Sequence, residues 1–145
     1  MKKLFILIFS VFFILPSISQ TEMDELRTRA LKVDKDSAAS CYARMAFLGT
    51  MVSPDTVRFY ANKAILLSSQ KKPAYGDALI QIGNSFSMQK KSDSALIYYS
   101  KAQVYYKKIN NKKGLGKAEQ SFAIVYFNIS EFNNAIAKAN LALGI

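Results

Sequence analysis

From residue 21 onwards, apolar residues recur three or four positions apart, the spacing that places them on one face of an α-helix. No stretch of useful length alternates apolar and polar residues as a half-buried strand would. The turns between the periodic segments are a few residues long, as expected for antiparallel helix hairpins. We therefore expect an all-α chain, with helices that begin near residues 21, 36, 54, 73, 92, 112 and 130.

Several helix starts are marked by residues that suit a helix N-terminus. Thr21 with Asp24 resembles a capping pair, and Ser53 supplies a hydroxyl ahead of Pro54, whose missing N–H is harmless in a first turn. The other expected starts or N-caps are Asp36 or Ser37, Pro73, Ser92, Lys112 or Lys113, and Ser130.

The chain also repeats itself. Small and large residues recur at offsets 0, 3, 12, 16 and 19 in three places: Met45, Leu48, Val57, Ala61 and Ala64; Gly83, Phe86, Ala95, Tyr99 and Ala102; and Ala123, Tyr126, Ala135, Ala139 and Ala142. Glycine inside a helix costs about 1 kcal/mol relative to alanine. We expect this cost at Gly83 to be offset because its missing side chain permits close packing of the partner helix near Tyr99. A period of 38 to 40 residues predicts a solenoid of about three hairpins, over residues 36–71, 73–109 and 113–145, preceded by a helix over 20–35.

The first 19 residues form a separate unit. Lys2 and Lys3 precede an apolar run from Leu4 to Leu15, which only Ser10 interrupts, and small residues follow Pro16. This layout predicts a secretory signal peptide over residues 1–19, hence an exported protein that is periplasmic or faces the periplasm. The alternative is an uncleaved membrane anchor, although the run is shorter than the ~20 residues of a spanning helix.

Composition argues against an enzyme. The chain has no His, so it lacks the usual general base near neutral pH and the commonest metal ligand. No metal-ligand spacing, phosphate-cradling glycine loop or nucleophile–base pair is present, and we expect no catalysis and no cofactor. The single cysteine, Cys41, lies in an apolar helical stretch and is expected to be buried. Despite 20 basic residues against 10 acidic ones, no nucleic-acid-binding module is recognisable.

The repeated small and large residues resemble the pattern of the tetratricopeptide repeat (TPR) family. Residues 74–106 match the family pattern almost whole, residues 116–143 match it except at Glu119 and Ala139, and residues 41–67 are degenerate. The resemblance implies a right-handed solenoid that binds a protein or peptide in a concave groove. A long repeat behind a signal peptide is similar to the arrays of bacterial sensor proteins, which implies the extracytoplasmic input region of a signalling protein. With an uncleaved anchor, the chain would instead be a membrane-tethered assembly factor.

The resemblance also implies which residues face the groove, on the first helix of each hairpin: Asp77, Ile80, Asn84, Ser87, Met88, Lys117, Gln120, Ile124 and Asn128. Asn84 and Lys117 are the polar pair expected to hold a peptide carboxylate or backbone.

Two further surfaces are candidates for contact. Lysines at the turns between hairpins predict either a solvated edge that complements helix dipoles or a basic rim for transient contact with a membrane surface: Lys71, Lys72, Lys107, Lys108, Lys112 and Lys113. The last helix presents Ile136, Leu141, Leu143 and Ile145. Because solenoid ends normally carry a polar cap, we expect either a fragment of a larger protein or a homodimer through this helix.

Overall fold

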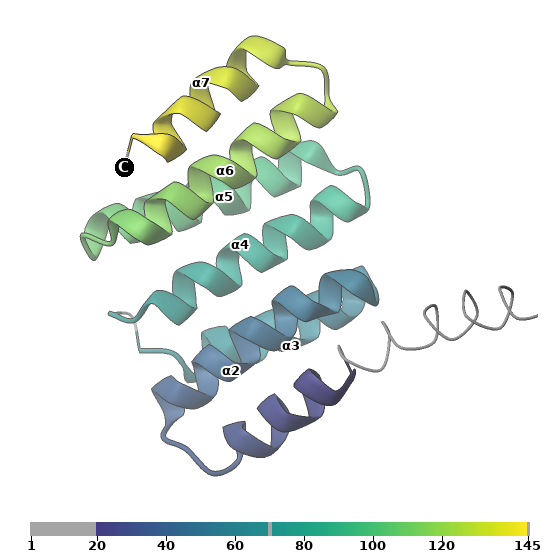
Figure 1. Cartoon of the computed structure of the whole chain (residues 1–145), viewed down its shortest axis with the longest axis vertical. Coiled ribbons are helices and arrows are strands. Elements are labelled where there is room, and N and C mark those ends of the chain that lie inside the picture. The colour runs from purple at the N-terminus through teal and green to yellow at the C-terminus, as the bar shows by residue number, and fades with distance from the viewer. Residues whose placement is uncertain (1–19, 70, 145) are drawn as a thin grey trace, which may run out of the picture.

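The computed structural model of the chain describes residues 20–69 and 71–144 (Figure 1). The predicted signal peptide and Ile145 lie outside the described residues. Residues 20–30 are helical, and a short 3₁₀ turn, η1 (Gly49–Met51), follows the next helix. The remaining helices are α2 (Lys35–Leu48), α3 (Pro54–Leu67), α4 (Pro73–Met88), α5 (Ser92–Lys108), α6 (Lys112–Asn128) and α7 (Phe132–Leu143). No described residue is in a strand, which confirms the all-α prediction.

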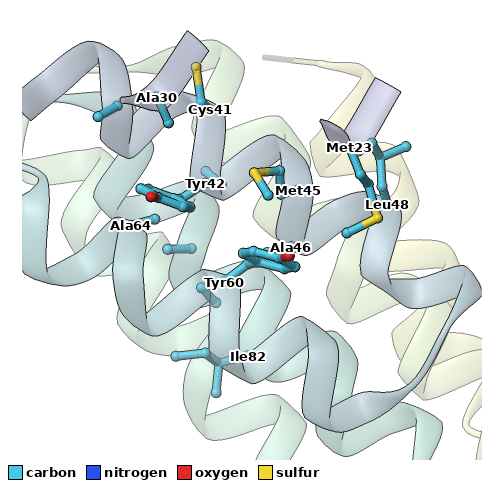
Figure 2. Packing of buried hydrophobic residues seen from close by; sticks show 14 residues of the cluster. Met23, Ala30, Cys41, Tyr42, Met45, Ala46, Leu48, Tyr60, Ala64 and Ile82 are labelled. Atoms are coloured by element: carbon cyan, nitrogen blue, oxygen red, sulfur yellow. The ribbon is translucent and has the colours of Figure 1, made fainter. Parts of the chain in front are cut away.

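The helices form a solenoid of three hairpins, α2–α3, α4–α5 and α6–α7, stacked in chain order along the longest axis (Figure 1). Each helix from α2 onwards packs on the next, and the first helices of the hairpins also meet directly, α2 with α4 and α4 with α6. The helix over residues 20–30 lies beside the first hairpin (Figure 1). Its Met23 joins a core that holds Tyr42, Tyr60 and, from α4, Ile82 (Figure 2).

The repeated small residues lie where neighbouring helices pack closely, as their spacing predicts. Ala95 and Ala102 on α5 are fully buried, and Tyr99 between them is 2% exposed. The ring of Tyr99 lies against Gly83 so closely that a Cβ there would come within 2.7 Å of Cδ1. Tyr106, two helical turns further along α5, is held the same way between Gly76 and Gly114.

Helix starts are confirmed at Pro54, Pro73 and Lys112, and several of the predicted N-caps are corrected. Ser53 accepts a hydrogen bond from the backbone N–H of Thr56, 3.1 Å away, as an N-cap should. The second helix is capped by Asp34 rather than by Asp36 or Ser37. Hydrogen bonds from the hydroxyl and backbone N–H of Ser37 lower the pKa of the Asp34 carboxyl. Asp36 instead accepts a hydrogen bond from the backbone N–H of Ser69, which fixes the end of α3.

The predicted caps at Ser92 and Ser130 are wrong. Ser92 is already the first residue of α5, and Ser130 has a left-handed backbone with φ of 64°. Lys90 and Asn110 take the same conformation in the two preceding turns. In each turn the residue after the left-handed one donates its N–H to the carbonyl five positions earlier, as Glu131 does to Tyr126. Each of these turns therefore ends a helix in a Schellman motif. The left-handed residue of each turn adopts the conformation that ends the preceding helix, and it does not cap the next one.

Glu119 breaks the apolar pattern and is nevertheless buried, at 3% exposure. Its carboxylate pairs with Lys138 of α7, at 2.9 Å between Oε2 and Nζ, and also accepts a hydrogen bond from Gln103 of α5. The Lys138 ammonium lies 4.5 Å from the centre of the Phe122 ring. The charge of Glu119 is therefore compensated by partners on both neighbouring helices, as a buried carboxylate requires.

The close contact at Gly83 makes a testable prediction. Substitution Gly83→Ala removes a helix-propensity cost of about 1 kcal/mol but drives a methyl group into a buried ring, an overpacking penalty of about 1–3 kcal/mol. We expect a net loss of stability in urea unfolding. Gly116→Ala is the matched control on α6, because a Cβ there meets only the carbonyl oxygen of Ala142 at 3.5 Å. The Gly116→Ala substitution should raise the free energy of unfolding by about 1 kcal/mol. Equal effects at the two glycines would contradict a packing role for Gly83.

Candidate functional site

The first helices of the three hairpins enclose a hollow of about 500 Å³ on one side of the solenoid. Each helix contributes four positions, in the same order. The lining residues are Ser40, Ala43, Arg44 and Phe47 of α2; Asp77, Ile80, Gln81 and Asn84 of α4; and Lys117, Gln120, Ser121 and Ile124 of α6. The hollow is thus built from structurally equivalent positions of successive repeats, and we call it the concave hollow.

Six of the nine residues expected to face the groove line the concave hollow: Asp77, Ile80, Asn84, Lys117, Gln120 and Ile124. Ser87, Met88 and Asn128 do not line it and lie at the carboxy-terminal ends of α4 and α6. The sequence pattern does not reveal the positions on α2, because the first repeat does not follow the 38-residue spacing there.

The register of the first hairpin explains that omission. The lining positions of α2 and α4 are 37 residues apart, as in Ser40 and Asp77, whereas those of α4 and α6 are 40 apart. At the 37-residue offset, Gly83 of α4 corresponds to the fully buried Ala46 of α2 rather than to Met45. The expected pattern of a small residue at this position is therefore present in all three hairpins. The 37-residue offset is the sequence signal that identifies the lining residues of α2.

Buried tyrosines from the second helices fix the polar side chains of the concave hollow. The Tyr106 hydroxyl donates to Asp77 Oδ1 at 2.9 Å, and the Tyr99 hydroxyl donates to Asn84 Oδ1 at 2.8 Å. Burial raises the pKa of both tyrosines, and the nearby Asp77 carboxylate raises that of Tyr106 further. Both hydroxyls therefore remain protonated donors at neutral pH.

The charges lining the concave hollow are paired within the chain. Lys117 Nζ lies 2.7 Å from Asp77 Oδ1, which ties α6 to α4, and the Arg44 guanidinium lies 2.9 Å from Glu22. Asn84, the expected partner of Lys117 in holding a carboxylate, donates to Gln81 at 2.9 Å. The two residues thus line the same hollow, but each is already engaged by a neighbour.

Besides ion-paired side chains such as Arg44 and Lys117, the accessible lining of the concave hollow consists of apolar and uncharged polar groups. Phe47 is 44% exposed and Ile124 is 54% exposed, while Gln120 is an exposed amide. The Arg44 guanidinium stacks over Phe47 at 5.1 Å from the ring centre. Such a surface can bind apolar side chains and hydrogen-bond a backbone. In residues 20–69 and 71–144, no group of three or more His, Cys, Asp or Glu side chains could hold a metal ion.

The lysines of the predicted basic rim are all exposed: Lys71, Lys72, Lys107, Lys108, Lys112 and Lys113. The Tyr105 hydroxyl donates to the carbonyl of Lys72 at 2.7 Å, which brings the turn before α4 beside the end of α5. Cys41 is buried, as predicted. None of the helices described here combines the length and apolar character needed to cross a membrane.

Comparison of the chain with models of known protein families, with curated proteins and with solved structures found no match.

The shared role of Asp77 can be tested by substitution. Asp77→Ala leaves the buried Tyr106 hydroxyl without its carboxylate acceptor, which should cost about 1–3 kcal/mol in urea unfolding. Lys117→Ala removes only the half-exposed partner and should cost less than about 1 kcal/mol. Equal losses in the two variants would show that the ion pair, and not the tyrosine, anchors Asp77.

Proposed function

We propose that this chain is a non-catalytic, TPR-like scaffold that binds a segment of another protein in the concave hollow. The observation that carries the proposal is the alignment of equivalent positions from α2, α4 and α6 along one surface. Repeat arrays use such continuous surfaces to bind extended partners. Because Tyr99 and Tyr106 hold Asn84 and Asp77 in place, little side-chain freedom is lost on binding, and the surface is preorganised.

The lining indicates the chemistry of the bound segment. Lys117 and Arg44 are each paired with a carboxylate of the chain, so the concave hollow offers little unpaired charge. Phe47 and Ile124 offer apolar contact, and the exposed Gln120 offers an amide. The best fit is a segment that inserts an apolar side chain and hydrogen-bonds through its backbone.

The cellular setting rests on the amino-terminal residues and on the family resemblance. A signal peptide over residues 1–19 would deliver the array to the periplasm, where it would serve as the input region of a bacterial signalling protein. An uncleaved segment would make it a membrane-tethered assembly factor. Amino-terminal sequencing of the mature protein separates the two proposals: we expect Gln20 as the first residue, and a start at Met1 would favour the anchor.

Binding in the concave hollow is tested by photo-crosslinking in the native host. A photoreactive phenylalanine analogue at Phe47 should give a discrete protein adduct. The matched control is Phe59 on α3, an aromatic residue of similar exposure, 54%, that does not line the concave hollow. With the partner purified, Phe47→Ala should weaken binding by about tenfold, or ~1.4 kcal/mol. Equal adducts at both sites, or none at Phe47, would refute the proposal.

A further inference from the structure

A second hollow, of about 940 Å³, opens on the outer face of the last hairpin, and we call it the end hollow. Small and apolar residues make up most of its lining, with two lysines at one end. The lining residues are Lys112, Lys113, Gly116, Gln120, Ala123, Ile124 and Phe127 of α6, and Ala135, Ile136, Ala139, Ala142 and Leu143 of α7. Ile136 and Leu143 are 59% and 86% exposed, so this face is unpartnered in the described residues.

The preceding hairpin shows what covers such a face. Ala135 and Ala142 of α7 stand 40 residues after Ala95 and Ala102 of α5, which are fully buried. The helix that packs on α5 and also contacts α4 is α6. The face that lines the end hollow is therefore the equivalent of one that, within this same chain, is covered by an amphipathic helix.

The two faces differ at several positions, and the replacement of Tyr99 by Ala139 bears most directly on the shape of the occupant. On the α4–α5 face, the Tyr99 ring fills the space above Gly83 and meets Phe122 of α6, with ring centres 5.7 Å apart. On the α6–α7 face, the equivalent residues are Ala123 and Ala139, both of which line the end hollow. Neither alanine fills the space that the Tyr99 ring occupies on the α4–α5 face, so a covering helix must supply a large side chain of its own.

Charge indicates both the orientation and the kind of partner. The helices α4 and α6 run parallel, because Asp77 and Lys117 pair near their starts and equivalent positions of both helices line the concave hollow in the same order. A helix placed on α6 in the same way would begin near Lys112 and Lys113. Acidic residues in its first turn would face these lysines and complement its own dipole. A second copy fits poorly, because each chain carries a formal net charge of +10.

We infer that the end hollow docks an acidic amphipathic helix of a partner protein. The helix lies parallel to α6, inserts a large apolar side chain between Ala123 and Ala139, and directs its first-turn carboxylates at Lys112 and Lys113. This surface is separate from the one in the proposed function, although Gln120 and Ile124 line both hollows.

The test uses the full chain and two fluorescent synthetic helices, each 17 residues long like α6. Both carry Leu at the offsets 0, 4, 8 and 11 that the buried Gly114, Ala118, Phe122 and Val125 occupy in α6. One has Glu in its first turn and the other has Lys there. Fluorescence anisotropy should show binding of the acidic helix at least about tenfold tighter than of the basic one. Absence of binding, or no preference between the two helices, would overturn the inference.

Variants locate the binding. Ala139→Tyr supplies the missing ring and Ala139→Glu places a charge in the end hollow. Both substitutions should weaken binding of the acidic helix by about tenfold or more. Ala139 is exposed, so circular dichroism should show unchanged helix content. Lys112→Glu with Lys113→Glu should reverse the preference between the probes. Undiminished binding to Ala139→Glu would overturn the inference.

Two further measurements distinguish helix docking in the end hollow from binding in the concave hollow and from dimerisation. Phe47→Ala alters the concave hollow alone and should leave the affinity for the acidic helix unchanged, so that failure at one surface does not imply failure at the other. Sedimentation of the full chain should show a monomer. A dimer that Ala139→Glu dissociates, with no binding of the acidic helix, would assign the end hollow to a second copy and overturn the inference.

Discussion

The packing of one tyrosine between two glycines holds the middle of this solenoid together. Tyr106 of α5 is 1% exposed, and its ring occupies the space that side chains at Gly76 of α4 and Gly114 of α6 would otherwise fill. Any larger residue at either glycine would push apart helices of consecutive hairpins. The contact therefore sets the distance between α4 and α6, and with it the width of the concave hollow that these helices line.

The same tyrosine joins the core to the candidate site. Its hydroxyl reaches Asp77, which in turn pairs with Lys117 across the first helices. Tyr99 repeats the arrangement with Asn84. A residue of the second helix thus contributes its ring to the core and its hydroxyl to the concave hollow, so core packing and the geometry of the candidate site are coupled. In the last hairpin, Ala139 stands in place of Tyr99.

Much of the fold could be predicted from the sequence, because helix period, proline starts and small-residue spacing report directly on packing. The contact of Gly83 with Tyr99 is an example. Ser92 and Ser130 mislead because a serine before a helix suits an N-cap, whereas here the backbone of the turn is set by the stop of the preceding helix. A one-residue difference in repeat length hides the α2 part of the concave hollow. The sequence does not predict which segment would bind there, because core packing does not constrain exposed residues such as Phe47.

The ion pair of Glu119 with Lys138 has a consequence for how such a chain assembles. Hairpins of similar shape can stack in the wrong order while a repeat protein folds, since each offers the same alternation of small and large residues. Leu79 occupies the position of Glu119 in the middle hairpin. An α7 docked on α4 would bury Lys138 against that leucine with no carboxylate to receive it, at a cost of several kcal/mol. We therefore expect this single ion pair to favour docking of α7 on α6 over docking on α4.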